Sequence, residues 1–412
     1  MRDNLNRKIK TPSDATLRRL STLILAIALA LAWNNFALAD DDGGRDGGDD
    51  HGGNNNQGEN GDRDNNRGEG DEGEGNGYKQ TNLVADLPGI AMLQDTNLVN
   101  AWGISFGPNT PFWVSDNGSG LATLYAVTNN GIGMPQVTKQ ALQVTIPGEG
   151  TPTGQLFNNT TGFHTNLFIF ASEDGTISGW RPALGKAAET LITAPNSVYK
   201  GITLISNVGG PMLLVANFRQ ATLDAYDGGV NLVHQFMDTN APDGYAPFNV
   251  QLLDGMVFVT FAKQDAAKHD DDPGRGHGLI DIFNPMTGMF HRYATGTDAG
   301  GHNSAINSPW GLAISPAKFG EHSDQLLVGN FGSGTIMALD EHGRLEGLLR
   351  DAHERTIVID GLWALTFGNG TKAGVPDTLY FSAGPDKESH GLFGQLEPAK
   401  KREHGRHHSH GH

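Results

Sequence analysis

The sequence contains no cysteine. This absence excludes disulfide bonds, thiolate-bound zinc, cysteine-ligated iron–sulfur clusters and cysteine nucleophiles. Charged residues make up 18% of the chain, and the net charge is −17. Nucleic-acid binding depends on clustered Lys and Arg, so this acidic balance argues against a nucleic-acid partner. Neither a Walker-type phosphate loop nor a His-Glu-x-x-His zinc motif occurs in the sequence.

Long apolar runs are scarce as well. A largely apolar stretch of fourteen residues runs from Leu20 to Trp33, whereas a membrane-spanning helix needs roughly 20. Six basic residues precede it, and Ala37-Leu38-Ala39 follows it as a small-x-small cleavage site. We therefore predict a signal peptide over residues 1–39 and an extracytoplasmic protein, periplasmic or secreted, with no stable membrane insertion after cleavage. The alternative is an uncleaved membrane anchor.

Both ends of the remaining chain have a biased composition. Residues 40–77 contain only Asp, Glu, Gly, Asn, Arg, Gln and one His. Without apolar side chains, nothing offsets the entropy of ordering the backbone, so this segment is predicted to be a disordered acidic linker. Residues 398–412 are basic and His-rich, and are predicted to form a disordered tail. Its histidine spacing suits zinc or nickel, and an expression scar is the alternative.

Between these ends, residues 78–397 repeat one pattern of short strands. Each copy has an apolar strand, a second strand that alternates apolar and polar side chains, a tight turn and a third strand. Anchor positions recur about every fifty residues, which is the period of a propeller blade; they are 102, about 153, 201, 248, 310 and 363. The alternation has period two, as in β-strands. We predict an all-β domain, a six-bladed β-propeller, rather than a β-sandwich or a parallel β-helix.

The ends of the repeat region predict how the ring closes. The last copy supplies three strands before Pro398, and an apolar strand over Thr81–Leu87 precedes the first full blade. We expect this N-terminal strand to complete the last blade as its outer strand, because that pairing removes an exposed sheet edge.

A ring of polar residues is predicted at one mouth of the central channel, because residues entering the first strand and leaving the second share one face. Its members are Asn100, Asp116, Asn117, Glu173, Asp174, Asn217, Asn307, Asn330, Asp360 and Asp386. Side-chain oxygens of this kind suit Ca²⁺ or Mg²⁺, and the candidate metal ligands are Asp116, Glu173, Asn217 and Asn330. The alternative is that these residues form turns with their own backbone.

A long polar loop over residues 263–278 replaces a tight turn at the same face. Long loops on rigid scaffolds often carry function, and His269 and Asp270 are the acid/base candidates here. The ligand-contact candidates are Lys263, Gln264, Asp265, Lys268, His269, Asp271 and, from the fifth blade, His302. A solvated hairpin insertion is the alternative interpretation.

Several long strings resemble a known family. YAPFNVQ from Tyr245, PWGLA from Pro309 and GLWAL from Gly361 are similar to uncharacterised secreted bacterial β-propellers, met in bacteria that use PEP-CTERM protein sorting. The resemblance implies export and a propeller, and it brings no established reaction. The His-rich tail replaces the Pro-Glu-Pro motif, apolar helix and Arg cluster of sorted members.

A looser resemblance is to NHL-type and gluconolactonase-type six-bladed propellers. That resemblance implies a divalent metal held by a Glu just before the inner strand of the first blade. In this sequence Asn100 and Ala101 occupy that place.

Three functional hypotheses follow from these patterns. The first is a secreted, monomeric binding module for a small ligand, a glycan or an envelope protein, with no catalytic role. The second is a lactonase-like hydrolase that depends on Ca²⁺ or Mg²⁺ and uses His269 or Asp270 as its base. The third is a structural envelope protein whose linker and tail act as adhesive ends.

Overall fold

The computed structural model describes residues 77–129, 134–207, 209–296 and 304–399. The predicted signal peptide, linker up to residue 76, His-rich tail from residue 400 and His302 lie outside these residues. Besides strands, the described part contains three short 3₁₀ turns, η1 (Phe163–Thr165), η2 (Pro182–Leu184) and η3 (Gly320–His322). None of the helices in these ranges has the length and apolar character needed to cross a membrane.

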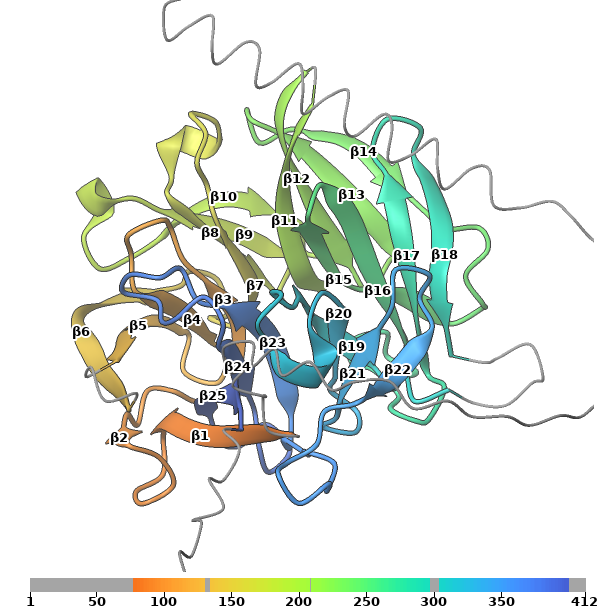
Figure 1. The fold of residues 1–412 in the computed structure, drawn as a ribbon. Coiled ribbons are helices and arrows are strands. Elements are labelled where there is room, and N and C mark those ends of the chain that lie inside the picture. The colour runs from red at the N-terminus through yellow and green to blue at the C-terminus, as the bar shows by residue number, and fades with distance from the viewer. Residues whose placement is uncertain (1–76, 130–133, 208, 297–303, 400–412) are drawn as a thin grey trace, which may run out of the picture. The chain divides into compact units, whose positions relative to one another are not determined.

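The strands form six sheets in a ring, which are the blades, and all neighbouring strands pair antiparallel except the first two of the chain, which belong to the last blade (Figure 1). Blade 1 contains β3 (Ala101–Ser105), β4 (Phe112–Asp116), β5 (Leu121–Asn129) and β6 (Pro135–Thr145). Blade 2 contains β7 (Pro152–Phe157), β8 (Phe168–Ser172), β9 (Thr176–Trp180) and β10 (Glu189–Thr193). Blade 3 contains β11 (Tyr199–Asn207), β12 (Gly210–Asn217), β13 (Thr222–Asp227) and β14 (Leu232–Phe236).

The other three blades follow in chain order. Blade 4 contains β15 (Tyr245–Leu253), β16 (Met256–Lys263), β17 (Gly278–Asn284) and β18 (Met289–Thr295). Blade 5 contains β19 (Pro309–Ile314), β20 (Leu326–Asn330), β21 (Ile336–Leu339) and β22 (Leu345–Leu348). Blade 6 contains β23 (Leu362–Phe367), β24 (Leu379–Ala383), β25 (Leu392–Pro398), β1 (Tyr78–Ala85) and the short β2 (Leu93–Gln94). The prediction of an all-β, six-bladed propeller is confirmed.

The burial of each strand follows from its place in the blade. Successive side chains of a strand point to opposite faces, and the blades pack face to face. The second strands β4, β8, β20 and β24 are therefore buried at every residue. The outer strand β14, by contrast, is exposed at four of its five residues. This gradient places the core between the blades rather than in one central layer.

Glycines allow the inner strands of neighbouring blades to approach closely. A Cβ atom added to Gly103 would lie 2.5 Å from the backbone oxygen of Thr153, and one added to Gly311 would lie 2.4 Å from that of Trp363. Side chains at these positions would force the blades apart, because packed interiors have no spare volume. The repeated glycine after the anchor residue is thus a packing requirement of the ring.

The first strand of each blade is an inner edge, whose unpaired backbone groups face the channel. Side chains of neighbouring blades bond several of them. Thr153 Oγ1 donates to the Tyr199 backbone oxygen at 2.8 Å, Gln155 Nε2 donates to Gly103 O at 2.8 Å, and Asn249 Nδ2 donates to Trp310 O at 2.7 Å. These bonds join successive blades and satisfy backbone acceptors that would otherwise be buried without a partner.

The N-terminal strand closes the ring, as predicted. β1 pairs antiparallel with β25, from Tyr78 opposite Pro398 to Ala85 opposite Leu392, and the two strands lie side by side in Figure 1. Tyr78 also reaches blade 5, where its hydroxyl donates to Phe319 O at 2.9 Å and accepts from His322 N at 3.1 Å. β1 therefore completes blade 6 and ties it to blade 5.

Candidate functional site

One end of the channel collects most of the polar side chains predicted for a site. The first strand of each blade begins at this end and the second strand ends there, so we call it the mouth. Seven polar residues at the mouth form a continuous hydrogen-bonded chain, which we call the mouth network. It comprises, in order, Glu388, Asn100, Asn117, Glu173, Lys200, Asp270 and His269.

The first half of the network joins blades 6, 1 and 2. Asn100, just before β3, donates through Nδ2 to Glu388 Oε2 at 2.7 Å and to Asn117 Oδ1 at 3.2 Å. Asn117, just after β4, donates to Glu173 Oε2 at 2.8 Å. Asn100 has a φ of 48°, a left-handed conformation that Asn tolerates better than most residues. Burial raises the pKa of Glu388, and the Asn100 bond only partly offsets it.

Lys200 is the centre of the second half. It belongs to β11, its side chain has an exposed fraction of 1%, and its ammonium contacts Glu173 Oε1 and lies 3.1 Å from Asp270 Oδ1. The ammonium also lies 5.0 Å above the Trp102 ring, a cation–π distance. Burial by itself lowers the pKa of Lys200, but Glu173 and Asp270 outweigh it and hold the pKa above its usual value. Lys200 is therefore a permanent buried cation.

The loop between β16 and β17 brings His269 and Asp270 to this cation. Asp265 Oδ1 accepts from the backbone N–H of His269 at 2.9 Å and so fixes the tip of the loop. His269 Nδ1 lies 3.0 Å from Asp270 Oδ1. Burial tends to raise the pKa of Asp270, but Lys200 and His269 outweigh it and lower the pKa below its usual value. Asp270 is therefore ionised at neutral pH.

The other predicted loop residues hold the loop in place. Gln264 donates to the Phe218 backbone oxygen at 2.5 Å, which anchors the loop to blade 3. Lys263 Nζ lies 2.6 Å from Asp272 Oδ2 in an exposed pair. Lys268 is exposed, and burial raises the pKa of Asp271. Within the described residues, only His269 and Asp270 of this candidate set enter the mouth network.

Of the four candidate metal ligands, only Glu173 belongs to the mouth network. In the described part of the chain, Asp116, Asn217 and Asn330 share no hydrogen-bond partner with it. Asn217 donates to Ser197 Oγ and to Asp224 Oδ2, both at 2.9 Å. Asn330 accepts from the Asn307 N–H at 2.9 Å, within blade 5. Across the turns that follow β12 and β20, Asn217 also accepts from Gln220 N at 3.3 Å, and Asn330 donates to Thr335 Oγ1 at 3.4 Å. These are turn contacts, as in the alternative interpretation.

Asp116, the remaining candidate, is fully buried in blade 1. Its two carboxyl oxygens have no hydrogen-bond partner within the described residues. Burial raises its pKa well above the usual value, which disfavours the deprotonated form that a metal ligand has to adopt.

Three of the remaining ring residues accept hydrogen bonds from backbone N–H groups of the loops around them. Asp174 accepts from the backbone N–H groups of Glu149 at 2.7 Å and Thr176 at 2.9 Å. Asn307 accepts from Gly274 N at 2.7 Å, and Asp360 accepts from Asp386 N at 2.8 Å. They shape the mouth without entering its network.

A different trio has the spacing of a metal centre. One ligand atom from each of Glu173, His269 and Asp270 lies within 4.8 Å of the others. Two carboxylates and an imidazole suit Zn²⁺ or Mn²⁺ better than Ca²⁺, which takes six to eight oxygens. The ammonium of Lys200, however, already pairs with both Glu173 and Asp270 and offsets part of their charge. A divalent cation at this trio has to compete with that built-in charge.

Aromatic side chains form the floor of the mouth. Trp102 and Trp363 stack with ring centroids 3.5 Å apart, and Phe331 stacks on Trp363 at 3.9 Å. Trp310 meets both indoles edge-on at about 6 Å. The indole N–H of Trp363 donates to Asn100 Oδ1 at 3.1 Å, so the floor also orients the network. The indoles close the channel at this end.

Sequence reasoning missed Lys200 and Glu388. The residues that align with Trp102 in the six first strands are Trp102, Thr153, Lys200, Phe248, Trp310 and Trp363, and Lys200 stands one residue before anchor position 201. A charge at one member of an otherwise uncharged ring was the available signal for Lys200. No such signal existed for Glu388. Its position depends on three consecutive residues with left-handed backbone conformation, 386–388, and no sequence motif predicts that turn.

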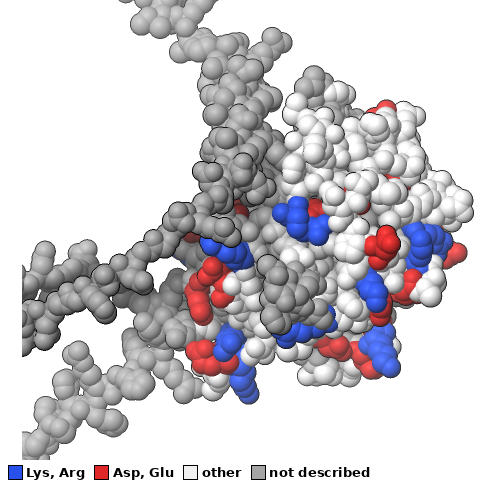
Figure 2. Space-filling view, turned by 90° about the vertical axis from the view of Figure 1, so that its right-hand side faces the viewer, with Lys and Arg blue, Asp and Glu red and all other residues white. Residues whose placement is uncertain are grey.

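On the side of the molecule shown in Figure 2, positive and negative side chains do not gather into separate patches. Lys and Arg side chains there are interspersed with Asp and Glu. Among the described residues, Arg344 pairs with Asp340 and Arg355 with Asp351, at 2.8 and 2.6 Å. Exposed pairs of this kind contribute little to stability, and this side offers no basic surface for nucleic acid.

Comparisons with known proteins give relatives without a stated function. No family model matches the chain. An uncharacterised protein of Acanthamoeba polyphaga mimivirus is 28% identical over 343 residues, which is 77% of this chain and 85% of that protein. A second uncharacterised mimivirus protein is 26% identical over 229 residues, and the match covers 53% of this chain and 40% of that protein.

Solved structures with similar folds are distant. A streptogramin B lyase aligns with a TM-score of 0.45 and 10% identity, over 78% of this chain and 97% of that one. A WD40 β-propeller domain aligns with a TM-score of 0.39 and 13% identity, over 72% and 93%. The propeller assignment therefore rests on the strand order of the structure itself.

Proposed function

We propose that this protein is an extracytoplasmic β-propeller that binds a small, positively charged ligand at its mouth. The observation that carries the proposal is the mouth network, in which side chains of five blades meet around Lys200. Export is supported by the apolar stretch over residues 20–33 and the cleavage site at Ala39. The resemblance to exported propellers of PEP-CTERM-sorting bacteria supports the same compartment.

The charge of the mouth sets the class of ligand. Three carboxylates, those of Glu173, Asp270 and Glu388, face one ammonium, that of Lys200. The ammonium is buried and already bonded, whereas the Asp270 side chain is 64% exposed. A ligand that arrives from solvent therefore meets acceptors and negative charge, which attract cations. Ammonium and guanidinium groups supply the matching charged donors.

The network also prepares the site before a ligand binds. Asn117 fixes Glu173, and Asn100 fixes Glu388, through hydrogen bonds of 2.8 and 2.7 Å. Groups held in place lose less conformational entropy on binding, which favours affinity. The half-buried Phe331 adds an aromatic surface beside these acceptors, suited to the apolar part of an organic cation.

Isothermal titration calorimetry on the mature chain, residues 40–412, tests this function. Spermidine and arginine amide are the cationic probes, acetamide is neutral and citrate is anionic. We expect heat of binding from the cationic probes only. Asp270→Asn removes the most exposed carboxylate of the network, and we expect it to weaken binding about tenfold, which corresponds to roughly 1.4 kcal/mol.

Glu341→Gln is the matched control, because it removes the same formal charge. Glu341 lies in the turn between β21 and β22, and its side chain is 82% exposed. It belongs to the opposite end of the blade, so its substitution should leave the affinity within about twofold, as usual for remote surface changes. If both variants weaken binding equally, only the net charge attracts the probes and the mouth is not the site.

A metal-dependent hydrolase is the second candidate, favoured by the spacing of Glu173, His269 and Asp270. In that function His269 or Asp270 acts as the base beside a divalent cation. Thermal unfolding with Zn²⁺, Mn²⁺, Ca²⁺ or EDTA distinguishes it, since a tight ligand stabilises the folded state by mass action. A large rise in the unfolding temperature with one cation, together with lactone hydrolysis, supports the hydrolase. Unchanged unfolding favours the binding module.

A further inference from the structure

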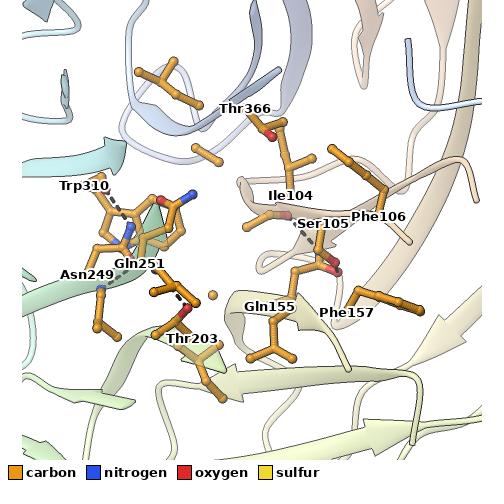
Figure 3. Close-up of a pocket in the computed structure, with 18 residues that line it drawn as sticks. Ile104, Ser105, Phe106, Gln155, Phe157, Thr203, Asn249, Gln251, Trp310 and Thr366 are labelled. Carbon is orange, nitrogen blue, oxygen red and sulfur yellow. Dashed lines mark hydrogen bonds between the residues drawn. The ribbon is translucent and has the colours of Figure 1, made fainter. Parts of the chain in front are cut away.

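The channel widens into a second cavity behind the aromatic floor, which we call the chamber. Its volume is about 340 Å³, and the first strands of all six blades line it. Figure 3 shows side chains from opposite walls, among them Gln155, Gln251 and Thr366. These residues follow the anchor positions along their strands, so the chamber lies away from the mouth. Its size is at the lower end of small-molecule pockets.

The indoles separate the chamber from the mouth network. The Trp363 N–H points to Asn100 of the network, and Lys200 lies over Trp102. Trp310 packs edge-on against both indoles and also lines the chamber. All three indoles have exposed fractions of 4% or less. The chamber is therefore a site of its own, reached from the other end of the channel.

The chamber wall excludes charged ligands. None of its lining residues is Asp, Glu, Lys, Arg or His. A charged group that leaves water without a counter-charge loses several kcal/mol or more of solvation. A neutral ligand avoids this cost.

Much of the polar wall is already held in place. Ser105 Oγ donates to Gln155 Oε1 at 2.9 Å, and Gln155 donates to the Gly103 backbone oxygen. Thr203 Oγ1 accepts from the Leu252 N–H at 3.1 Å. Ser105 is the serine of a Gly-x-Ser-x-Gly string at 103–107, but it lies in strand β3 and not on a strand-to-helix elbow. These groups form a rigid frame without a nucleophile.

Two polar side chains on the wall keep unused donors. The side-chain amide of Gln251 makes no hydrogen bond to another described residue. The indole N–H of Trp310 is buried and has no partner within the described ranges. The Gln251 amide lines the chamber, so a ligand that accepts a hydrogen bond from it is favoured. Phe106, Phe157 and Trp310 supply aromatic surface around these groups.

We propose that the chamber binds a neutral polyhydroxylated molecule the size of a monosaccharide or an inositol. Such a molecule offers hydroxyls to the Gln251 amide and the inner-edge backbone groups. Its ring carbons fit against the aromatic wall. The proposal is independent of the ligand at the mouth, because different residues form the two sites.

Calorimetry with myo-inositol and glucose, against glucuronate and glucose 6-phosphate as charged analogues, tests the proposal on the mature chain. We expect the neutral probes to bind and the charged analogues to bind at least tenfold more weakly. Gln251→Trp fills the chamber from blade 4, and Thr366→Phe fills it from blade 6. Each should weaken binding of the neutral probes at least tenfold. Two filling variants guard against one that misfolds.

Thr287→Trp is the control, because it adds the same ring on an exposed turn of blade 4, and it should bind the neutral probes as the wild type does. Equal affinity in a folded filling variant and the wild type overturns the proposal. So does equal binding of glucuronate or glucose 6-phosphate, or no binding of the neutral probes. A crystal grown with myo-inositol that shows only water in the chamber overturns it as well.

Discussion

Removal of β1 should open the ring and unfold the domain. The side chains of Tyr78, Leu83 and Val84 have exposed fractions of 2%, 0% and 0%. Burial of an apolar side chain of this size contributes about 1.5–3 kcal/mol, so their loss removes roughly 5–9 kcal/mol. The total stability of a domain is about 5–15 kcal/mol. A chain that begins at Asp86 should therefore fail to unfold cooperatively, whereas one that begins at Gly77 should do so.

Urea unfolding, followed by circular dichroism and tryptophan fluorescence, measures this difference. A synthetic peptide of residues 77–86 added to the shorter chain should restore a cooperative transition, because it supplies the missing edge strand. Leu83→Ala in the full chain is a milder version, expected to cost about 2–5 kcal/mol.

The matched control is Lys79→Ala, on the same strand, whose side chain is 58% exposed. It should change the stability by no more than about 0.5 kcal/mol. A shorter chain that unfolds as cooperatively as the longer one, within about 1 kcal/mol, refutes the closure argument, since β1 would then be dispensable.

Three further predictions concern the interior. Gly201→Ala places a Cβ atom 2.2 Å from Asn249 Oδ1 and should destabilise the protein by about 1–3 kcal/mol in urea unfolding; an unchanged midpoint contradicts the close packing of blades 3 and 4. Burial raises the pKa of Asp281 to about 7, only partly offset by Arg292, so the stability it contributes is complete below about pH 4 and is lost as pH rises through about 7. Asp281→Asn should flatten this decline between pH 5 and 8, and a wild-type midpoint that rises over that range refutes the assignment. Lys200→Met should lower the free energy of unfolding by about 3–5 kcal/mol, because it leaves buried charge unpaired. Adding Glu173→Gln should recover part of this loss. If the losses of the two substitutions simply add, the two side chains do not act as a pair.

The fold was predictable because every blade repeats the same strand pattern. Trp102-Gly103, Lys200-Gly201 and Trp310-Gly311 start the first strands of three blades, and each glycine is needed for the approach of the next blade. Six such signals reinforce one another, so an irregular copy, such as β7, does not obscure the period. The closing strand was predictable from counting, since blade 6 had only three strands of its own.

The site was only partly predictable, because its geometry depends on loops. The sequence placed Asn100, Asn117 and Glu173 at the mouth, but it gave no means to separate them from the turn-forming Asn217 and Asn330. That distinction depends on which hydrogen-bond partner each side chain has, and the partners in the network come from neighbouring blades. Similarly, the cation in the mouth network is the ammonium of Lys200, whereas the sequence patterns predicted a bound metal ion.

Ring closure by β1 also determines when the protein can become whole during its synthesis. β1 is the first described strand to leave the ribosome, yet Ala85 pairs with Leu392 near the other end of the chain. At about 5–20 residues per second, the roughly 300 intervening residues take about 15–60 s to appear. Throughout that time β1 has an apolar edge and no partner, and blades 1 to 5 form an open arc. A chain interrupted late in translation is therefore left unclosed, even though most of its sequence has been made.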